Sequence, residues 1–276
     1  MFDQTSQITM DGIQAAGGLQ HGRGPLIEAR DLVKRFGGLR AVDGMTIALG
    51  RGEMVGLIGP NGAGKTTLFN LIAGSLKPSA GSIRIRGVEV ARRGPERRIA
   101  LGLGRTFQIP RPFAEMTVLE NVLTGGQHQA GERAWMNFLR PGRVAAQEKA
   151  AMEKARELLD FVLLSRLERE PARVLSGGQR KLLEFARLLM ADPEVVLLDE
   201  PAAGVNPTLL ELIIDRVLEL NRRGKTILLI EHNMDVVARL CGRVVVMAAG
   251  RALAEGPPAA IARDPAVIDA YLGGLA

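Results

Sequence analysis

Cysteine, aromatic residues and long hydrophobic runs are all scarce in this chain of 276 residues. The single cysteine, Cys241, excludes an internal disulfide and fits a reducing compartment, so we expect it to be a small buried hydrophobic side chain. Because aromatic residues make up only 4% of the sequence, the core must consist mainly of aliphatic side chains and alanine. No window approaches the roughly 18 apolar residues that a membrane-spanning helix needs, so a role at a membrane would depend on partner proteins.

The first 25 residues also lack the features of a secretory signal. They contain an early aspartate, Asp3, with no basic start and no apolar stretch. We therefore interpret residues 1–25 as a flexible tail and residues 26–276 as one large domain. The formal net charge of +6 favours an anionic partner, which could be a nucleotide, a nucleic acid or a membrane face.

Three short apolar runs predict the centre of a parallel sheet. Residues 54–59 (MVGLIG), the VVLL of residues 195–200 and the ILLI of residues 226–232 form continuous apolar runs, which is typical of strands buried on both faces. The stretch 207–224 (PTLLELIIDRVLELNRRG) lies between the last two runs and predicts a crossover helix. The sequence therefore predicts an α/β fold with a mostly parallel core sheet.

Other segments predict structure around this core. Alternating polar and apolar residues at 26–36 and 44–53 predict paired strands, and residues 81–87 (GSIRIRG) predict the strand of an edge hairpin, so we expect an antiparallel β edge. From about 109 to 190 the pattern is helical, which predicts an inserted α-helical subdomain. A small C-terminal helix is expected at about 265–272.

Residues 59–67 (GPNGAGKTT) follow one apolar run and open a helix, which is the context that a phosphate-binding P-loop requires. The glycines allow backbone N–H groups to approach phosphates, Lys65 supplies a positive charge, and the Thr66 hydroxyl is suited to Mg²⁺. A glycine-rich turn with a chance lysine is the alternative, but the flanking strand and helix favour the P-loop. The predicted nucleotide-binding residues of this segment are Gly59, Pro60, Asn61, Gly62, Ala63, Gly64, Lys65, Thr66 and Thr67.

Polar side chains follow other predicted strands, at the sheet edge where ligands bind in open parallel sheets. Asp199 is placed to hold Mg²⁺, and Glu200 to deprotonate an attacking water, although either could instead cap the following loop. His232 follows residues 226–231 and is placed to sense a γ-phosphate. Gln108 could join the Mg²⁺ or water shell, or be an ordinary loop residue, and Phe36 could stack on a base or pack in the core.

Residues 175–179 (LSGGQ) form a second motif at a helix start. Ser176 and Gln179 fit a capping box, in which each side chain satisfies a free N–H group of the first turn. Gly177 and Gly178 are not explained by capping, because each glycine costs about 1 kcal/mol relative to alanine in a helix. Paired glycines at a helix N-terminus suggest that an anion approaches bare backbone, although the chain already has a P-loop.

Taken in order, the P-loop, RTFQ, LSGGQ, VVLLDE and EH motifs resemble those of the nucleotide-binding subunits of ABC transporters. The resemblance covers residues about 26–272 and is specific because the motifs keep the family's order. It implies the ABC-type P-loop NTPase fold and a Mg²⁺-dependent ATP hydrolase. It also implies that Phe36 stacks on adenine, Gln108 is the Q-loop glutamine and His232 is the switch histidine.

The resemblance also explains why one chain has two phosphate-binding motifs. In this family two ATPase domains associate head to tail, and each ATP lies between the P-loop of one chain and the LSGGQ helix of the other. It therefore implies that Ser176, Gly177, Gly178 and Gln179 contact the ATP of a partner chain. ATP would close the dimer, hydrolysis would open it, and this motion would drive membrane subunits.

The implied partners follow from the same resemblance. They are two membrane-spanning permease subunits, a second ABC ATPase that is more often a different chain than a copy, and indirectly an extracytoplasmic substrate-binding protein. Arg111 and Phe113 lie where family members receive the permease coupling helices. The chain would be peripheral, at the cytoplasmic face of the inner or plasma membrane.

Local stretches indicate a branch of the family. The sequence is most similar to the ATP-binding component of importers for branched-chain or other hydrophobic amino acids, on GPNGAGKTTLFN, GRTFQ, LLDEPAAGVNP, IEHNMDVV and DPAVIDAYLG. Asn206 stands where many ABC proteins have the D-loop aspartate, and this branch commonly has asparagine there. Related importers of urea, other amides and aromatic acids share most of these features, and a lipid exporter is a further alternative.

A soluble ABC ATPase acting on nucleic acid is the alternative from another class. Such proteins usually carry tandem cassettes or a long coiled-coil insertion, and this sequence has neither. An arginine-rich stretch is broken by Glu89 and Glu96 and lacks interleaved aromatic residues, so we expect a solvated or membrane-proximal face and no nucleic-acid partner. The arginines are at positions 84, 86, 92, 93, 97, 98 and 105.

Overall fold

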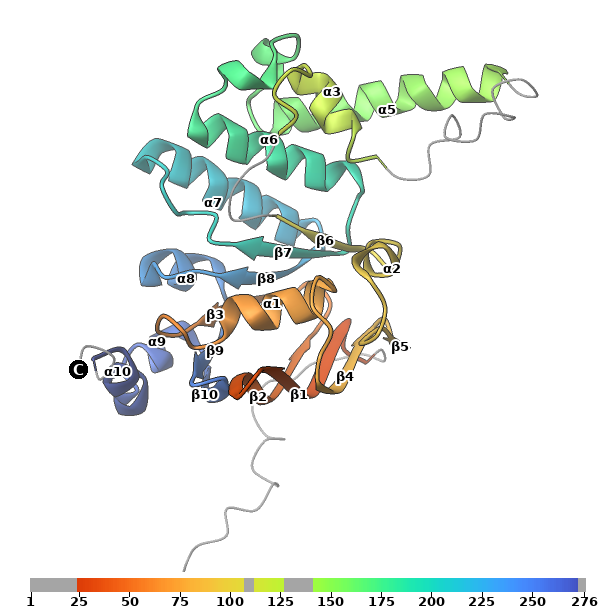
Figure 1. Cartoon of the computed structure of the whole chain (residues 1–276). Coiled ribbons are helices and arrows are strands. Elements are labelled where there is room, and N and C mark those ends of the chain that lie inside the picture. Colours follow the sequence, from red (N-terminus) through yellow and green to blue (C-terminus); the bar gives the residue numbers. More distant parts are fainter. Residues whose placement is uncertain (1–23, 107–111, 127–140, 273–276) are drawn as a thin grey trace, which may run out of the picture.

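The structure is a computed structural model that describes residues 24–106, 112–126 and 141–272 (Figure 1). Most of the predicted tail, the predicted Q-loop glutamine Gln108, and Arg111 lie outside the described residues. The expected start of the helical subdomain at about 109 lies outside them too.

A six-stranded sheet forms the centre of the described part of the chain. Its strand order is β10-β9-β3-β8-β7-β6, and every neighbouring pair is parallel except β10 with β9. All residues of β3, β7 and β8 are buried, as their apolar runs predict; the polar members are Asp199 at the end of β7 and Thr226 at the start of β8. The strands are β3 (Met54–Ile58), β6 (Leu103–Arg105), β7 (Val195–Asp199), β8 (Thr226–Ile230), β9 (Arg243–Ala248) and β10 (Arg251–Gly256).

A smaller antiparallel sheet has the order β2-β1-β4-β5, which confirms the expected antiparallel β region. The edge hairpin expected at residues 81–87 is formed by β4 and β5: β4 pairs with β1 on one side and with β5, the edge strand, on the other. The strands of this sheet are β1 (Ile27–Phe36), β2 (Leu39–Leu49), β4 (Ala80–Ile85) and β5 (Val88–Glu89).

The two faces of the central sheet bury different elements, because successive strand residues point to opposite sides. Val195 and Leu197 of β7 face a core shared with α1 (Lys65–Ala73) and the antiparallel sheet. Val196 and Leu198 face a second core shared with the helices on the other side. The P-loop helix α1 and the LSGGQ helix α6 (Gly177–Met190) therefore lie on opposite faces of the sheet (Figure 1).

The second core contains the helical region that the sequence predicts. Helices α3, α5 and α6 pack against one another and form the upper layer in Figure 1, with α7 beneath them. These elements and the short 3₁₀ helices between them are α3 (Val118–Leu123), α5 (Pro141–Phe161), η3 (Ser165–Leu167), η4 (Ala172–Val174) and α7 (Pro207–Arg222).

The last described helices lie beside the sheet edge formed by β10. Helices α9 and α10 contact this strand, and α10 agrees with the helix predicted at about 265–272. The remaining helices are α2 (Pro95–Ile99), α8 (Met234–Leu240), α9 (Pro258–Ile261) and α10 (Pro265–Leu272). Within the described ranges, no helix combines the length and the apolar character that crossing a bilayer requires.

Cys241 is buried against β3, as predicted. Burial raises the pKa of its thiol to about 12, and a side chain at Gly56 would approach its sulfur. Cys241 therefore acts as a small packing residue.

The arginine-rich stretch departs from its predicted solvated face most completely at Arg98. Arg98 of α2 is fully buried, and burial lowers the pKa of its guanidinium to about 10. Its Nη1 donates to the carbonyl oxygens of Leu71 and Ile72, at the C-terminal end of α1, and Nη2 donates to that of Val90. Gly74 ends α1 at a φ of 85°, and a Cβ there would overlap the Arg98 side chain. Arg98 thus caps the C-terminal end of the P-loop helix.

Replacing Arg98 with methionine should leave these buried carbonyl groups without donors. We expect the free energy of unfolding to fall by about 3 kcal/mol, measured by denaturant titration. The matched control is Arg97→Met, since Arg97 is an exposed neighbour on the same helix and should cost less than about 0.5 kcal/mol. Equal stability of the two variants would contradict the capping role.

Candidate functional site

The P-loop connects β3 to α1 and presents backbone N–H groups at the start of the helix. No side chain caps α1; its N-cap residue is Gly64, at a φ of 98°. A Cβ at Gly64 would overlap the carbonyl oxygen of Ala41, and one at Gly59 would overlap that of Met247, so glycine is required at both positions. The loop therefore provides a concave set of donors that suits a phosphate.

Lys65 lies inside this loop. It is 6% exposed, and its Nζ donates to the carbonyl oxygens of Gly59 (2.7 Å) and Pro60 (2.9 Å). Burial lowers the pKa of Lys65, whereas the nearby Glu200 carboxylate raises it. The first hydroxyl after Lys65, on Thr66, belongs to an exposed residue at the mouth of the loop.

The predicted carboxylates lie where β7 ends, beside the end of β8. Asp199 is 4% exposed; burial raises its pKa, and the Arg105 guanidinium opposes that shift. One carboxylate oxygen, Oδ2, is 3.2 Å from Nη2 of Arg105. The other, Oδ1, is buried and has no hydrogen-bond partner among the described residues. Such an orphaned oxygen is expensive to bury, and a metal shell would satisfy it.

Glu200 and His232 form a pair across two strand ends. Nε2 of His232 is 3.0 Å from Oε1 of Glu200. The Glu200 backbone has a positive φ of 50°, and its N–H donates to the carbonyl oxygen of Ile230 in the neighbouring strand. The structure thus brings together Lys65, Asp199, Glu200 and His232, as the sequence predicts for the carboxyl ends of parallel strands.

Phe36 is 47% exposed at the end of β1, so the alternative of core packing does not apply to it. Nζ of Lys34 lies 5.0 Å from the centre of its ring. An exposed aromatic face of this kind is available to stack on a base.

The LSGGQ motif starts α6 with the predicted capping box. Ser176 Oγ accepts from the N–H of Gln179, and Gln179 Oε1 accepts from the N–H of Ser176. The two glycines differ. A Cβ at Gly178 would overlap the Leu209 side chain, which is a packing reason for glycine that the sequence did not reveal, whereas a Cβ at Gly177 would meet nothing within 4 Å.

Asn206 caps α7: its Oδ1 accepts from the N–H of Leu209 at 2.9 Å. This contact gives Asn206 a local structural role. Phe113 is exposed, and the guanidinium of Arg187 on α6 lies 5.2 Å from the centre of its ring.

Three further residues lie near the carboxylates and carry no site motif in the sequence. Arg105 belongs to the arginines expected on a solvated face, but its side chain is 14% exposed and contacts Asn70 of α1 (2.5 Å) as well as Asp199. Lys181 of α6 donates to backbone carbonyls after β7, and Glu231 at the end of β8 accepts from nearby backbone N–H groups. A signal existed for Glu231, because it is a carboxylate next to His232 at the end of an apolar run.

The Arg105–Asp199 contact predicts a pH-dependent stability difference. Because Arg105 lowers the Asp199 pKa, Arg105→Met should raise that pKa further above its unfolded value of about 3.9. An aspartate with a raised folded pKa destabilises the fold above that pKa, and the cost disappears as pH falls through it. We expect Arg105→Met to be less stable than the parent at about pH 8, and the difference to narrow toward about pH 5, measured by denaturant unfolding.

The control is Arg84→Met, which removes an exposed arginine that is 3.7 Å from Glu89. The free energy of unfolding of Arg84→Met should differ little from that of the parent at either pH. A difference for Arg105→Met that stays constant or widens toward acidic pH would contradict the assignment.

Comparison with known families covers most of the chain. Residues 42–203 match the family model described as ABC transporter, and residues 253–276 match the model described as branched-chain amino acid ATP-binding cassette transporter. The second match includes the C-terminal helix α10.

Curated relatives and solved structures agree with these matches. The chain is 39% identical over 248 residues to the probable branched-chain amino acid transport ATP-binding protein LivG of Archaeoglobus fulgidus, covering 90% of this chain and 95% of the relative. It is 39% identical over 251 residues to the high-affinity branched-chain amino acid transport ATP-binding protein LivG of Escherichia coli (strain K12), covering 90% and 98%. A crystal structure of a nucleotide-free ATP-binding cassette from an ABC transporter superposes with a TM-score of 0.78 at 37% identity, covering 90% of this chain and 98% of that one.

Proposed function

The chain belongs to the ABC transporter family of ATP-binding proteins, and on that premise we propose that it energises an importer of branched-chain or other hydrophobic amino acids. ATP binding and hydrolysis follow from the family. The substrate class rests on the printed names of the relatives and on the C-terminal match at 253–276. The observation that carries the chemistry is the convergence of Lys65, Asp199 and the Glu200–His232 pair at one sheet edge.

Each residue at this edge has a role that its position supports. The P-loop N–H groups and Lys65 would bind the phosphates, and Lys65 would exchange its two loop carbonyls for phosphate oxygens. Glu200 would accept the proton of the attacking water, while His232, bonded to Glu200 at 3.0 Å, would orient that carboxylate and approach the γ-phosphate. Phe36 would stack on the adenine.

A magnesium ion fits the residues present. The Thr66 hydroxyl, the Asp199 carboxylate with its orphaned Oδ1 and, from outside the described residues, Gln108 would provide oxygen ligands. When bound, Mg²⁺ supplies charge neutralisation at the β- and γ-phosphates.

The second phosphate-binding motif would act on the ATP of a partner chain. Helices α1 and α6 pack on opposite faces of the sheet, which supports separate nucleotides for the two motifs. A Cβ at Gly177 would meet nothing within 4 Å, and Ser176 is exposed. The backbone of Gly177 and the hydroxyl of Ser176 are therefore accessible to the γ-phosphate of an ATP bound to another chain. Gln179 would support this contact by completing the cap on Ser176.

Membrane permease subunits are the partners of an ATP-binding transporter subunit, and the chain is accordingly membrane-associated. We further assign two permease subunits, a second and different ABC ATPase, and indirectly an extracytoplasmic substrate-binding protein. The site of action would be the cytoplasmic membrane face. The exposed Phe113, stacked by Arg187, supports a permease contact near the start of the helical region.

Glu200→Gln tests the chemistry. Glutamine keeps the size of the side chain but removes the base, so we expect ATP affinity to be retained and turnover to fall at least about 100-fold. Nucleotide binding and phosphate release measure the two effects. The control is Glu211→Gln, an exposed carboxylate paired with Arg239 on the surface, which should hydrolyse ATP normally. Near-normal hydrolysis by Glu200→Gln would remove Glu200 as the base.

Ser176→Asp, compared with Ser176→Asn, tests the contact with a partner's ATP. Both residues are good helix N-caps, so α6 should remain intact in both variants. Only aspartate places a negative charge beside the expected γ-phosphate, so we expect Ser176→Asp to lose hydrolysis while binding ATP normally, and Ser176→Asn to keep substantially more activity. Equal rates in the two variants would mean that no phosphate approaches Ser176.

A further inference from the structure

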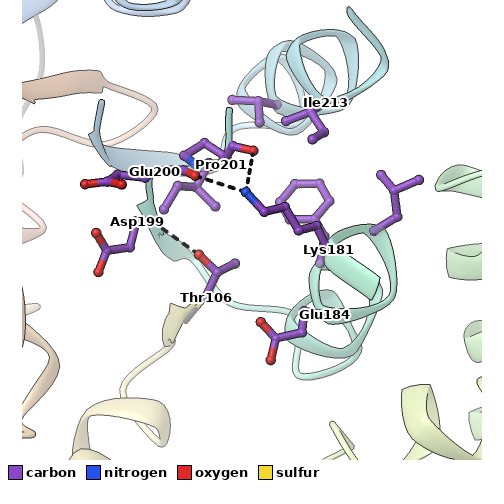
Figure 2. A pocket seen from close by; sticks show the side chains of 11 residues that line it. Thr106, Lys181, Glu184, Asp199, Glu200, Pro201 and Ile213 are labelled. Carbon is purple, nitrogen blue, oxygen red and sulfur yellow. Dashed lines mark hydrogen bonds between the residues drawn. The ribbon is translucent and has the colours of Figure 1, made fainter. Parts of the chain in front are cut away.

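The turn that follows β7 is held from two sides by residues that the proposed chemistry does not use. It comprises residues 200–203 and begins with Glu200. On one side Lys181 of α6 contacts backbone carbonyl groups, and on the other Glu231 at the end of β8 contacts backbone N–H groups (Figure 2 shows the Lys181 side).

Lys181 donates hydrogen bonds to three carbonyl groups of the turn. Its Nζ donates to the carbonyl oxygens of Glu200 (3.4 Å) and Pro201 (3.4 Å), and also to that of Ala203. An ammonium has three donors, so this one side chain has an acceptor for each of them on the turn. In Figure 2 the Lys181 side chain extends from α6 to this backbone, whereas the Asp199 and Glu200 carboxylates point away from α6.

Glu231 holds the opposite side of the turn. It is 3% exposed; its Oε1 accepts from the N–H of Ala202 at 2.7 Å, and its Oε2 accepts from that of His232 at 3.1 Å. The negative charge of Glu231 raises the pKa of Lys181 against the effect of burial, so the two charges act on one another across the turn. A cation at carbonyl groups and an anion at N–H groups both match the peptide dipoles between them.

The first residue of the turn has an uncommon backbone conformation. Glu200 has a φ of 50°, in the left-handed region that residues other than glycine adopt in only a few per cent of cases. A cavity of about 40 Å³ lies between α6, β7 and α7 beside Lys181. The hydrogen bonds of Lys181 connect α6 directly to the backbone of the turn that begins with Glu200.

We propose that Lys181 and Glu231 are positioning residues that clamp the turn 200–203, and that through this clamp the LSGGQ helix controls the placement of Glu200 in the same chain. The inference rests on the proposed role of Glu200. Ser176, at the start of α6, would meet the ATP of a partner, and Lys181 lies one turn and a half further along the helix. Binding of the partner's ATP at Ser176 would thereby change the position of Glu200, which acts on the ATP bound to its own chain.

Lys181→Met tests the clamp in the full-length chain, because methionine keeps an unbranched side chain and removes all three donors. We expect the Kd for ATP to stay within about twofold and kcat to fall at least about tenfold, since small displacements of a catalytic group are costly. Lys181→Arg restores a cation at the same place and should recover most of kcat. The control, Lys225→Met, removes a half-buried lysine that binds Asp192 away from the turn, and should leave kcat unchanged.

Amide hydrogen exchange provides a readout that does not depend on turnover. The N–H of Ala203 donates to the carbonyl oxygen of Glu200, and that of Ala202 donates to Glu231. In Lys181→Met, the peptide covering 200–203 should exchange faster than in the parent and in Lys225→Met. Glu231→Gln is a second variant of nearly identical shape; it should also lower kcat and speed this exchange, because its bond to Ala202 is no longer charge-assisted.

The outcomes separate the clamp from the function on which it rests. If Glu200→Gln hydrolyses ATP normally in the same assay, the proposed chemistry is wrong, and the clamp is overturned with it. If Glu200→Gln is inactive but folded Lys181→Met keeps kcat within twofold of the parent, or the exchange of 200–203 is unchanged in Lys181→Met and Glu231→Gln, the clamp alone is overturned. A loss of kcat without rescue by Lys181→Arg would also contradict a positioning role for the cation.

Discussion

The burial of the Asp199 carboxylate at the edge of the central sheet is the constraint on which the arrangement of the site depends. β7 is buried along its whole length, so its last side chain ends in a region of low dielectric, where an unpaired charge is expensive. Arg105 meets one oxygen of this carboxylate and is itself tied to Asn70 of the P-loop helix, so β6, β7 and α1 are joined by one polar network. The remaining oxygen has no hydrogen-bond partner among the described residues, and the Mg²⁺ proposed for this site would satisfy it.

The central sheet also determines how the two phosphate-binding motifs can be used. The residues of each buried strand divide between two cores, with α1 in one and α6 in the other, so the two motifs belong to different layers of the molecule. A sheet between them is consistent with motifs that serve different nucleotides. The turn after β7 connects the two layers. It begins with Glu200, whose carboxylate points away from α6, and its backbone carbonyl groups accept hydrogen bonds from Lys181 of α6.

Much of the fold and of the candidate site could be predicted from the sequence, because those features depend on residues close together in the chain. Apolar runs predict β3, β7 and β8, a fixed spacing predicts the P-loop, and Ser176 with Gln179 predicts the capping box of α6. Features that depend on distant partners could not be predicted. Arg98 resembles its exposed neighbours in sequence but meets carbonyls 26 and 27 residues earlier. Gly178 is explained by Leu209, a contact between separate helices, and no local pattern shows that Lys181 and Glu231 meet the same turn.

The most direct test of the central claim, that one chain supplies halves of two ATP sites, is a distance from α6 to bound nucleotide in the assembled transporter. A nitroxide can be placed at the exposed position 180 by Arg180→Cys, because the native Cys241 is buried, and Mn²⁺ can replace Mg²⁺ beside ATP in a Glu200→Gln background. Pulsed electron paramagnetic resonance then measures nitroxide–manganese distances. We expect a nitroxide–manganese distance in the ATP-bound assembly that is shorter than any found for the isolated chain with its own nucleotide. Finding only the distance of the isolated chain, with ATP bound throughout the assembly, would contradict it.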